Sequence, residues 1–241
     1  MKNKNFFYQQ YNKINWENQE KTKLNSFIYK FVIKEIFSKK KGPNIKIFDI
    51  GFGVGFFIKM IHQELNRSYK NMIIEGCEPS EKNYKHFIKK SLNFIEGVKL
   101  RTHNKTFLKT KTDEKFDFIT SIYVFPHFVS EELEESAKKI HSMLNNGGKF
   151  ILVVANEKYL KEKLKSMKDL FIEKNILEFD NKEYEEVLHY SDLPEIGKVI
   201  DYNREEKFYI NLFRKHRFKL EMKRDMNDND FICTIFVFEK L

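Results

Sequence analysis

The sequence predicts an α/β fold built on a doubly wound, mixed seven-stranded sheet. Three observations support this prediction. Short apolar runs alternate with helical patterns between residues 44 and 155, a glycine-rich turn follows the first run, and the C-terminal end reads as a hairpin. Strands that alternate with helices of this length are typical of βαβ units with right-handed crossovers and a parallel sheet. The terminal hairpin adds two strands that are antiparallel to each other.

The first predicted element is a helix that follows an N-terminal arm. Its apolar face holds Leu24, Phe27, Ile28, Phe31 and Ile36, and "KKKGPN" ends the pattern. Further along the chain, apolar runs predict five strands, at 44–50, 71–79, 98–102, 116–124 and 149–155. Helical periodicity predicts helices at 56–65, 81–92 and 131–144, with Ser80 and Ser130 as N-caps and "NNGG" as the stop of the last.

About sixty residues between the fifth strand and the hairpin exceed what a plain βαβ pattern needs. They begin with a predicted helix whose apolar face is Leu160, Leu164, Met167 and Phe171, and they continue as a segment dense in Tyr, His, Asp and Glu. A helix with Phe208, Tyr209, Leu212 and Phe213 follows. We therefore predict one domain with four parts: an N-terminal lid and helix (1–42), a core (43–156), an insertion over a binding site (157–206) and a C-terminal helix end with the hairpin (207–241).

Composition limits the function. A chain of 241 residues with 41% hydrophobic residues can bury one substantial core. The net charge of +9 comes from lysines that alternate with acids along the chain, so we favour a solvated surface over a nucleic-acid site. No apolar run or leader pattern indicates a membrane span or secretion, so a cytoplasmic protein is expected. Cys77 and Cys233 lie in apolar runs and are expected in the core rather than in a disulfide or metal site.

The stretch "DIGFGVGFF" places three glycines, Gly51, Gly53 and Gly55, at the end of the first strand. In an open α/β sheet, ligands bind beyond the carboxyl ends of the strands, and the following helix N-terminus favours negative charge. A ligand with an anionic or polar tail is expected. Phe56 stands where a dinucleotide fingerprint would have its third glycine, which disfavours a pyrophosphate, and no Gly-Lys-Ser/Thr follows as in a Walker loop.

This stretch resembles motif I of the class I S-adenosylmethionine (SAM)-dependent methyltransferases, which are Rossmann-like enzymes. The next acid strengthens the resemblance, because Glu78 closes the second strand in "IIEGCEPS", where Glu75 is the alternative. "KFDFITSIYVFPHF" resembles the fourth strand of the family, with His127 at its His position and Pro126 in place of the usual acid. "MLNNGGKFILVVAN" resembles the turn and fifth strand. The resemblance covers roughly residues 40–156 and the hairpin.

The resemblance implies SAM as cofactor, S-adenosylhomocysteine as product and no metal. It implies that Asp49 orients the methionine amino group, that the glycine backbone faces the methionine portion, and that Glu78 accepts the ribose hydroxyls. A polar residue after the third strand would contact adenine, for which Asn104 is the first choice and Lys105 the second. Ser121, at the fourth strand, and Tyr11, in the arm, complete the expected cofactor site.

Methyl transfer to a hydroxyl or ammonium needs a proton acceptor, and histidine is sufficient. His127, just past the fourth strand, and His189, in the insertion near Asp192, are the candidates. The alternative for His127 is a structural role in holding its loop. The alternative for His189 is a position in a solvated surface loop. Arg204 is expected to pair with Glu205 or Asp201 rather than with an acidic acceptor. In the arm, Tyr8, Tyr11 and Trp16 are equally compatible with closing over the cofactor and with packing on the domain.

The leading functional hypothesis is methyl transfer to O or N of a small-molecule acceptor, with a sugar and a phosphorylated metabolite as the examples considered. An RNA or protein methyltransferase is the first alternative; its weakness is the fourth-strand end, "SIYV", which lacks the Asp/Asn-Pro-Pro-aromatic tetrad that similar enzymes use on nucleobase amines. A nicotinamide-dependent oxidoreductase conflicts with the glycine spacing. A SAM-binding protein without catalysis stays open.

Overall fold

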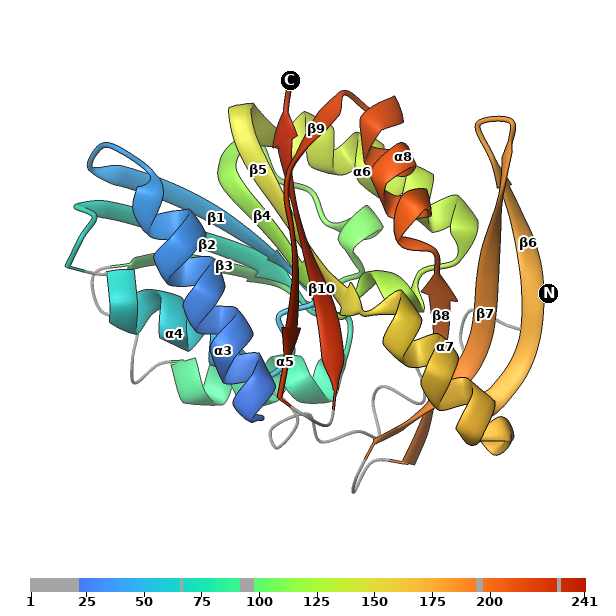
Figure 1. Ribbon diagram of the computed structural model, residues 1–241. Helices are drawn as coiled ribbons and strands as arrows, with labels where there is room; N and C mark the ends of the chain where they lie inside the picture. Colours follow the sequence, from blue (N-terminus) through green and yellow to red (C-terminus); the bar gives the residue numbers. More distant parts are fainter. Residues whose placement is uncertain (1–21, 66, 92–97, 194–196, 229–230) are drawn as a thin grey trace.

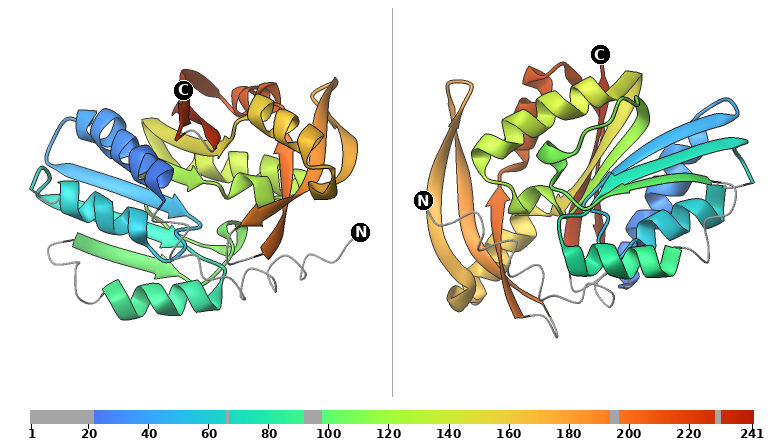
Figure 2. Two further views of the ribbon diagram at one scale, coloured as in Figure 1. Left: turned by 60° about the horizontal axis from the view of Figure 1, so that its bottom comes forward. Right: turned by 180° about the vertical axis from the view of Figure 1, so that it is seen from behind.

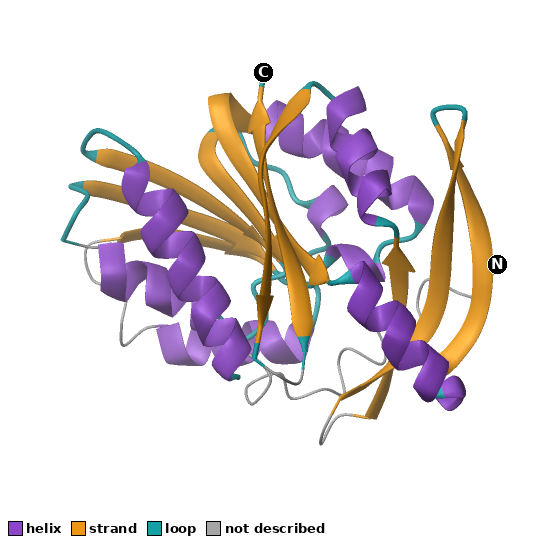
Figure 3. Cartoon of the chain, viewed as in Figure 1, coloured by secondary structure: helices purple, strands orange, loops and turns teal. Residues whose placement is uncertain are grey.

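The computed structural model describes residues 22–65, 67–91, 98–193, 197–228 and 231–241 (Figure 1). Within these ranges the chain forms a seven-stranded and a three-stranded sheet (Figure 3). The larger sheet has the order β3-β2-β1-β4-β5-β10-β9, in which β1 to β5 are parallel and β10 runs antiparallel to β5 and β9. The predicted mixed seven-stranded sheet with its terminal hairpin is confirmed. Its strands are β1 (Asn44–Ile50), β2 (Asn71–Cys77), β3 (Val98–His103), β4 (Phe116–Ile122), β5 (Leu144–Ala155), β9 (Phe218–Asn227) and β10 (Ile232–Lys240).

Helices cover both faces of this sheet (Figure 2). On one face lie α3 (Lys23–Phe31), α4 (Phe56–Leu65) and α5 (Glu81–Ser91), and on the other lie α6 (Ser130–Met143) and α8 (Glu206–Lys215). After α3 the chain continues through a π-helical turn (Val32–Ile36) and a 3₁₀ turn (Phe37–Lys39). β1 alternates between the two cores, since Ile45 and Ile47 face the first and Phe48 and Ile50 the second.

Several predicted boundaries differ from the structure. β2 ends at Cys77 and β4 at Ile122, before the predicted ends at 79 and 124. The N-cap of α6 is Val129, and Ser130 is its first helical residue; Glu132 completes the turn by accepting from the Val129 N–H at 3.2 Å.

The "NNGG" stretch follows α6 directly, as its predicted stop, but it lies within the bounds of β5, which begins at Leu144 rather than at 149. Leu144 pairs with Phe116 of β4, and the next pair is Lys149 with Phe118. The four residues between them, including Gly147 with φ +70°, therefore form an irregular bulge in the strand.

The insertion contains α7 (Glu157–Ser166), a 3₁₀ turn (Lys168–Leu170) and an antiparallel sheet in the order β6-β7-β8. Its strands are β6 (Phe171–Phe179), β7 (Lys182–Leu193) and β8 (Gly197–Arg204). The predicted apolar helix face is right for Leu160 and Leu164 but wrong for Met167 and Phe171, which are 41% and 45% exposed. Phe171 opens β6 opposite His189, so the chain has already left the helix at that point.

Hydrogen bonds tie the two ends of the insertion together. The backbone N–H of Glu206, at the start of α8, donates to Glu157 Oε2 at 2.9 Å, at the start of α7. Asn156 Nδ2 donates to Thr234 Oγ1 on β10 at 3.0 Å. The chain therefore leaves the core and returns to it at nearly the same place, and we call these contacts the insertion junction.

Two further predictions concern single features. Cys77 and Cys233 are both free and buried, as expected for core residues. None of the helices in the described part of the chain has the length and apolarity needed to cross a membrane.

Candidate functional site

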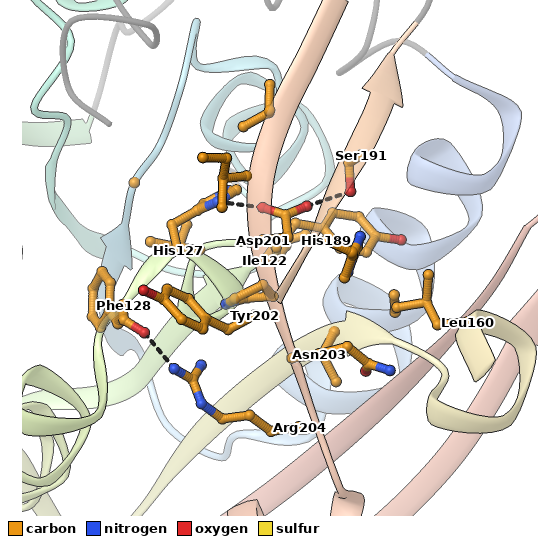
Figure 4. A pocket seen from close by; sticks show the side chains of 18 of the residues that line it. Ile122, His127, Phe128, Leu160, His189, Ser191, Asp201, Tyr202, Asn203 and Arg204 are labelled. Atoms are coloured by element: carbon orange, nitrogen blue, oxygen red, sulfur yellow. Dashed lines mark hydrogen bonds and ion pairs between the residues drawn. The ribbon is translucent and has the colours of Figure 1, made fainter. Parts of the chain in front are cut away.

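The site lies where the central strands end. Ile50 at the end of β1 is level with Cys77 of β2 and Ser121 of β4, so the loops that follow these strands meet at one edge of the sheet. A cavity of about 2010 Å³ opens there. The glycine loop and the end of β2 line one part of it, which we call the cofactor half. The turn after β4 (Phe125–His127, η4), α7 and the insertion sheet line the other part, the acceptor half, shown in Figure 4.

The glycine loop has the tight geometry that its sequence predicts. Gly51 donates its N–H to the carbonyl of Cys77 at 2.8 Å and has φ +69°, and a Cβ there would lie 2.5 Å from Val124 Cγ2. Gly55 has φ +83°, and a Cβ there would lie 2.0 Å from the Phe87 ring. Both positions therefore require glycine. Gly55 serves the close packing of α5 against the loop, and only Gly51 and Gly53 line the cavity.

Glu78 is buried at the cavity wall with an exposed fraction of 4%. One carboxylate oxygen accepts the Gly53 N–H at 2.9 Å and the other accepts the Ser80 N–H at 2.8 Å, and the side chain of Asn83 adds a further hydrogen bond to the carboxylate. Burial raises the pKa of Glu78 to about 7, although these hydrogen bonds act to lower it. The alternative acid, Glu75, lies within β2, where His103 Nε2 is 2.9 Å from its Oε1, and it does not line the cavity.

Asp49 is the second buried acid of the cofactor half, at 3% exposure. Its Oδ1 accepts the Thr120 hydroxyl at 2.6 Å. Burial raises the pKa of Asp49 to about 7, and the charge of Glu78 contributes in the same direction. Within the described ranges, neither acid has a lysine or arginine partner, and no lysine or arginine lines the cofactor half. The chain thus holds two carboxylates at one wall without a matching cation.

Of the other predicted cofactor residues, Asn104 and Ser121 are not among those that line the cavity. Asn104 donates from Nδ2 to the carbonyl of Glu78 at 2.9 Å, which fixes the loop after β2. Ser121 is fully buried in β4, and its hydroxyl has no hydrogen-bond partner in the described part of the chain. Tyr11, like Tyr8 and Trp16, lies outside the described residues. Roles for these residues in cofactor binding stay predictions.

In the acceptor half, His127 lies on η4 directly after β4 and lines the cavity. Its Nδ1 is 2.6 Å from Asp201 Oδ1 on β8, and the other oxygen of Asp201 accepts the Ser191 hydroxyl at 2.5 Å (Figure 4). Burial raises the pKa of Asp201, but the charge and hydrogen bond of His127 outweigh it, and the net pKa lies below the ordinary value. Asp201 thereby fixes the imidazole orientation and leaves Nε2 as the ring nitrogen for other contacts.

His189 approaches the same carboxylate from the other side. It lies on β7 directly opposite Asp201 of β8, is 2% exposed and lines the cavity. The alternative of a solvated loop is therefore wrong, because cross-strand pairing buries this segment. Asp192 was the expected partner; its side chain lies outside the described part of the structure.

Arg204 fastens the insertion sheet to η4. Its Nε is 2.6 Å from Glu186 Oε2, its Nη2 donates to the Phe128 carbonyl at 2.7 Å, and its Nη1 donates to the Phe125 carbonyl at 3.4 Å. The guanidinium carbon also lies 4.7 Å from the centroid of the Tyr202 ring. The side chain is 0% exposed, so its charge is compensated entirely inside the protein.

The expected partners of Arg204 are therefore wrong. Asp201 is held by His127, and Glu205 instead accepts the backbone N–H of Glu185 at 3.1 Å. The prediction missed Glu186 because cross-strand neighbours in the insertion sheet are far apart in sequence. The pairing of His127 with Asp201 had no local signal for the same reason.

Comparisons with known proteins agree on one family. The sequence model of a methyltransferase domain matches residues 21–195. A curated relative from Alkaliphilus oremlandii (strain OhILAs), described as an uncharacterized methyltransferase, is 29% identical over 169 residues, which are 68% of this chain and 69% of that protein.

Solved structures agree in fold. A SAM-dependent methyltransferase from Clostridium acetobutylicum ATCC 824 has a TM-score of 0.61 at 15% identity, with 98% of each chain covered. Magnesium protoporphyrin IX methyltransferase from Synechocystis PCC 6803 with bound SAM has a TM-score of 0.68 at 12% identity, covering 100% of this chain and 98% of that one. N-methyltransferase NodS from Bradyrhizobium japonicum WM9 with S-adenosyl-L-homocysteine has a TM-score of 0.64 at 11% identity, with 98% of each chain covered. At these identities the likeness concerns the fold.

Proposed function

The chain belongs to the methyltransferase domain family, and from that premise we propose that it transfers the methyl group of SAM to an oxygen or nitrogen atom of a small-molecule acceptor. The observation that carries the proposal is the single cavity of about 2010 Å³ that joins the glycine loop to the insertion sheet. A cofactor bound in one half and an acceptor bound in the other would be neighbours in the same cavity.

The cofactor half fits SAM by charge. SAM carries an ammonium and a sulfonium group, and Asp49 and Glu78 are two buried carboxylates without a cationic partner in the described residues. A positive ligand would favour their ionised forms, which burial disfavours. By the family resemblance, Asp49 would hold the methionine amino group and Glu78 the ribose hydroxyls, and both acids line the cavity. The backbone of Gly51 and Gly53 would border the methionine portion.

When bound, SAM supplies a methyl group that is already activated by the sulfonium charge. The residues of the chain therefore have to align the acceptor, exclude water and accept a proton. His127 is the proposed proton acceptor, because Asp201 orients its ring from Nδ1 and stabilises the imidazolium that forms. His189 is the second candidate, since it is buried at the same wall.

The insertion of residues 157–206 is the proposed cover of the acceptor site. Within the N-terminal lid and helix (1–42), the arm that precedes α3 is the proposed lid. Support for the first comes from α7 and the insertion sheet, which line the acceptor half. The carboxylates at this wall also disfavour an RNA backbone as the acceptor. A small molecule is consistent with the relative from Synechocystis, whose name specifies a porphyrin.

The test has a binding part and a transfer part. We expect SAM and S-adenosylhomocysteine, but not NAD(P), to raise the melting temperature in a thermal-shift titration. Glu78→Ala should weaken SAM binding by about 1–3 kcal/mol through loss of charge-assisted hydrogen bonds. Glu81→Ala, an exposed acid at the start of α5, is the matched control and should bind normally. Equal binding by both variants would mean that Glu78 is not the cofactor acid.

Transfer is followed with tritium-labelled SAM and a small-molecule cell extract. Label that moves to small molecules in the presence of the wild-type protein supports the proposal. SAM binding without any labelled product would favour the non-catalytic alternative, and label on added RNA or protein would favour a macromolecular acceptor.

A further inference from the structure

Carboxylates outnumber lysines and arginines in the acceptor half, which is unusual for a protein with a net charge of +9. Outside the cofactor half, the described lining residues of the cavity include two lysine or arginine side chains and six carboxylates. The cations are Lys163 and Arg204. The carboxylates are those of Glu173, Glu186 and Asp201 on the insertion sheet, of Glu131 and Glu132 at the start of α6 beside η4, and of Asp228 between β9 and β10, and of these Glu186 is paired with Arg204 and Asp201 with His127. The wall that meets the acceptor is thus acidic, although the chain as a whole is basic.

Arg204 cannot compensate an anionic acceptor. Its Nε, Nη1 and Nη2 are already directed at Glu186 and at the carbonyls of Phe125 and Phe128, and the side chain is fully buried. Releasing it would leave Glu186 as a buried charge without its partner, which costs several kcal/mol. Among the described lining residues, Lys163 on α7 is the remaining lysine or arginine, and its Nζ lies 5.8 Å from the centroid of the Tyr159 ring. A phosphate or carboxylate is normally bound by several converging donors, and one lysine does not provide them.

Two polar side chains at the same wall are available to a ligand. His189 is 2% exposed and Asn203 is 7% exposed, and both line the cavity (Figure 4). Neither side chain has a hydrogen-bond partner among the residues that the structure describes, although the charge of His189 acts to lower the pKa of the nearby Asp201. Buried polar side chains of this kind are normally hydrogen-bonded, so a bound molecule is the expected partner. The Asn203 carbonyl accepts N–H donors.

Apolar side chains form the rest of this wall. They come from α7, the 3₁₀ turn after it and the insertion sheet, and they are Leu160, Leu164, Leu170, Ile172, Val199 and Ile200. They provide room for an apolar body next to the polar groups.

We infer that the acceptor is a small molecule with an amine on an apolar body and without a phosphate or carboxylate group, and that the amine nitrogen is methylated. The inference rests on the proposed function and narrows it. An ammonium acceptor first gives one proton to His127. The nitrogen lone pair then forms the bond to the methyl carbon while the carbon–sulfur bond breaks, and its electron pair stays on sulfur. The products are a methylated ammonium and the neutral thioether.

The first experiment compares three matched probes, 2-phenylethylamine, 2-phenylethanol and phenylacetate, with the protein saturated by S-adenosylhomocysteine. Thermal-shift titration gives the apparent dissociation constant of each. We expect the amine to bind at least about tenfold more tightly than the carboxylate, because a like charge at an acidic wall costs binding energy. If the amine binds no better than the carboxylate, whether both bind or neither does, the inference is overturned.

Two variants test whether the preference for the amine over the carboxylate comes from the carboxylates of the acceptor half. Glu173→Gln removes an exposed carboxylate of β6 and should reduce the advantage of the amine about threefold. Glu162→Gln is the matched control, because it removes the same charge from an exposed position of α7 that does not line the cavity, and it should leave the preference for the amine intact. A reduced preference in Glu162→Gln, or an unchanged preference in Glu173→Gln, would contradict the assignment.

The second experiment separates a small-molecule cell extract by cation and anion exchange and offers each fraction to the protein with tritium-labelled SAM. Label in the fraction retained by cation exchange supports an amine acceptor. Label in the anion-exchange or unretained fraction overturns this inference and leaves the proposed methyltransferase activity intact. Failure of SAM itself to stabilise the protein would instead contradict the proposed function.

Discussion

The two halves of the cavity differ in whether their buried carboxylates have a cationic partner. In the cofactor half, Asp49 and Glu78 have neutral hydrogen-bond donors and no cationic partner among the described residues. In the acceptor half, Asp201 is matched by His127, and Glu186 is matched by Arg204. The first arrangement raises the pKa of both acids to about 7, whereas the second lowers the pKa of Asp201.

This difference indicates what each half is built to do. Carboxylates without a cation reduce the stability of the ligand-free protein, and they regain it when a positive ligand arrives. Charges that are paired within the chain form a wall of fixed geometry and leave the neutral groups to contact the ligand. The following changes test this contrast, from the largest expected effect to the smallest.

Removing the buried cation of the acceptor half should have the largest effect. Arg204→Met leaves Glu186 without its partner and releases the carbonyls of η4, so we expect a loss of about 3–5 kcal/mol in the free energy of unfolding. Urea denaturation measures it. The double variant Arg204→Met/Glu186→Met should recover part of the loss, because no buried charge remains. A double variant as unstable as the single one would show that the carbonyl contacts, rather than the ion pair, carry the effect.

Removing the proposed proton acceptor should affect turnover rather than cofactor binding. His127→Ala is expected to lower kcat about a hundredfold with an unchanged dissociation constant for SAM. His86→Ala on α5, which does not line the cavity, is the control. We expect Asp201→Asn to lower kcat as well and to shift its pH profile, because the orientation and charge of the imidazole change. If His127→Ala and His189→Ala both keep full turnover, the base is another group or is not needed.

Neutralising an acid of the cofactor half should stabilise the ligand-free protein. The pKa of Asp49 rises from the ordinary 3.8 to about 7 on folding, so the folded state binds more protons between these values and its stability falls as the pH rises through them. At about pH 8, Asp49→Asn should therefore raise the free energy of unfolding by about 1–2 kcal/mol, and at about pH 4 the gain should vanish. The same variant should bind SAM more weakly. If Asp49→Asn instead lowers the free energy of unfolding at pH 8, the ionised Asp49 is stabilised by a partner, and the contrast between the two halves fails.

The smallest effect concerns the pH dependence of SAM affinity. Since a cationic ligand prefers both acids ionised and burial holds the pKa of each at about 7, affinity should fall by about tenfold between pH 8 and pH 6. Calorimetric titration should show proton release on binding near pH 7. Glu78→Gln should make the dependence shallower. A flat profile in the wild-type protein would contradict the proposed role of the two acids.

Predictability from the sequence also differed between the halves. In the core, every predicted strand and helix is present, and β1 and α4 have the predicted bounds. The largest difference is the start of β5, at Leu144 instead of 149. Local signals are sufficient to predict the core. The periodicity of each strand and helix, the glycines with positive φ and the position of Glu78 can each be recognised within a short stretch of sequence. The insertion was predicted as a helix and an unassigned polar segment. Phe171 continues the helical spacing of α7, yet it pairs with His189 in the sheet. Pairing partners far apart in sequence decide such strands, and one sequence does not reveal them.

The insertion junction has an evolutionary consequence. Because Glu157 and Glu206 are joined by a hydrogen bond, a replacement segment needs only two ends that lie equally close together. The loop-closure cost rises slowly with length, so segments of different size are tolerated at such a point. The part of the chain that meets the acceptor can therefore be exchanged as a cassette while Asp49 and Glu78 keep their places, and a new substrate preference can arise without redesigning the shared core.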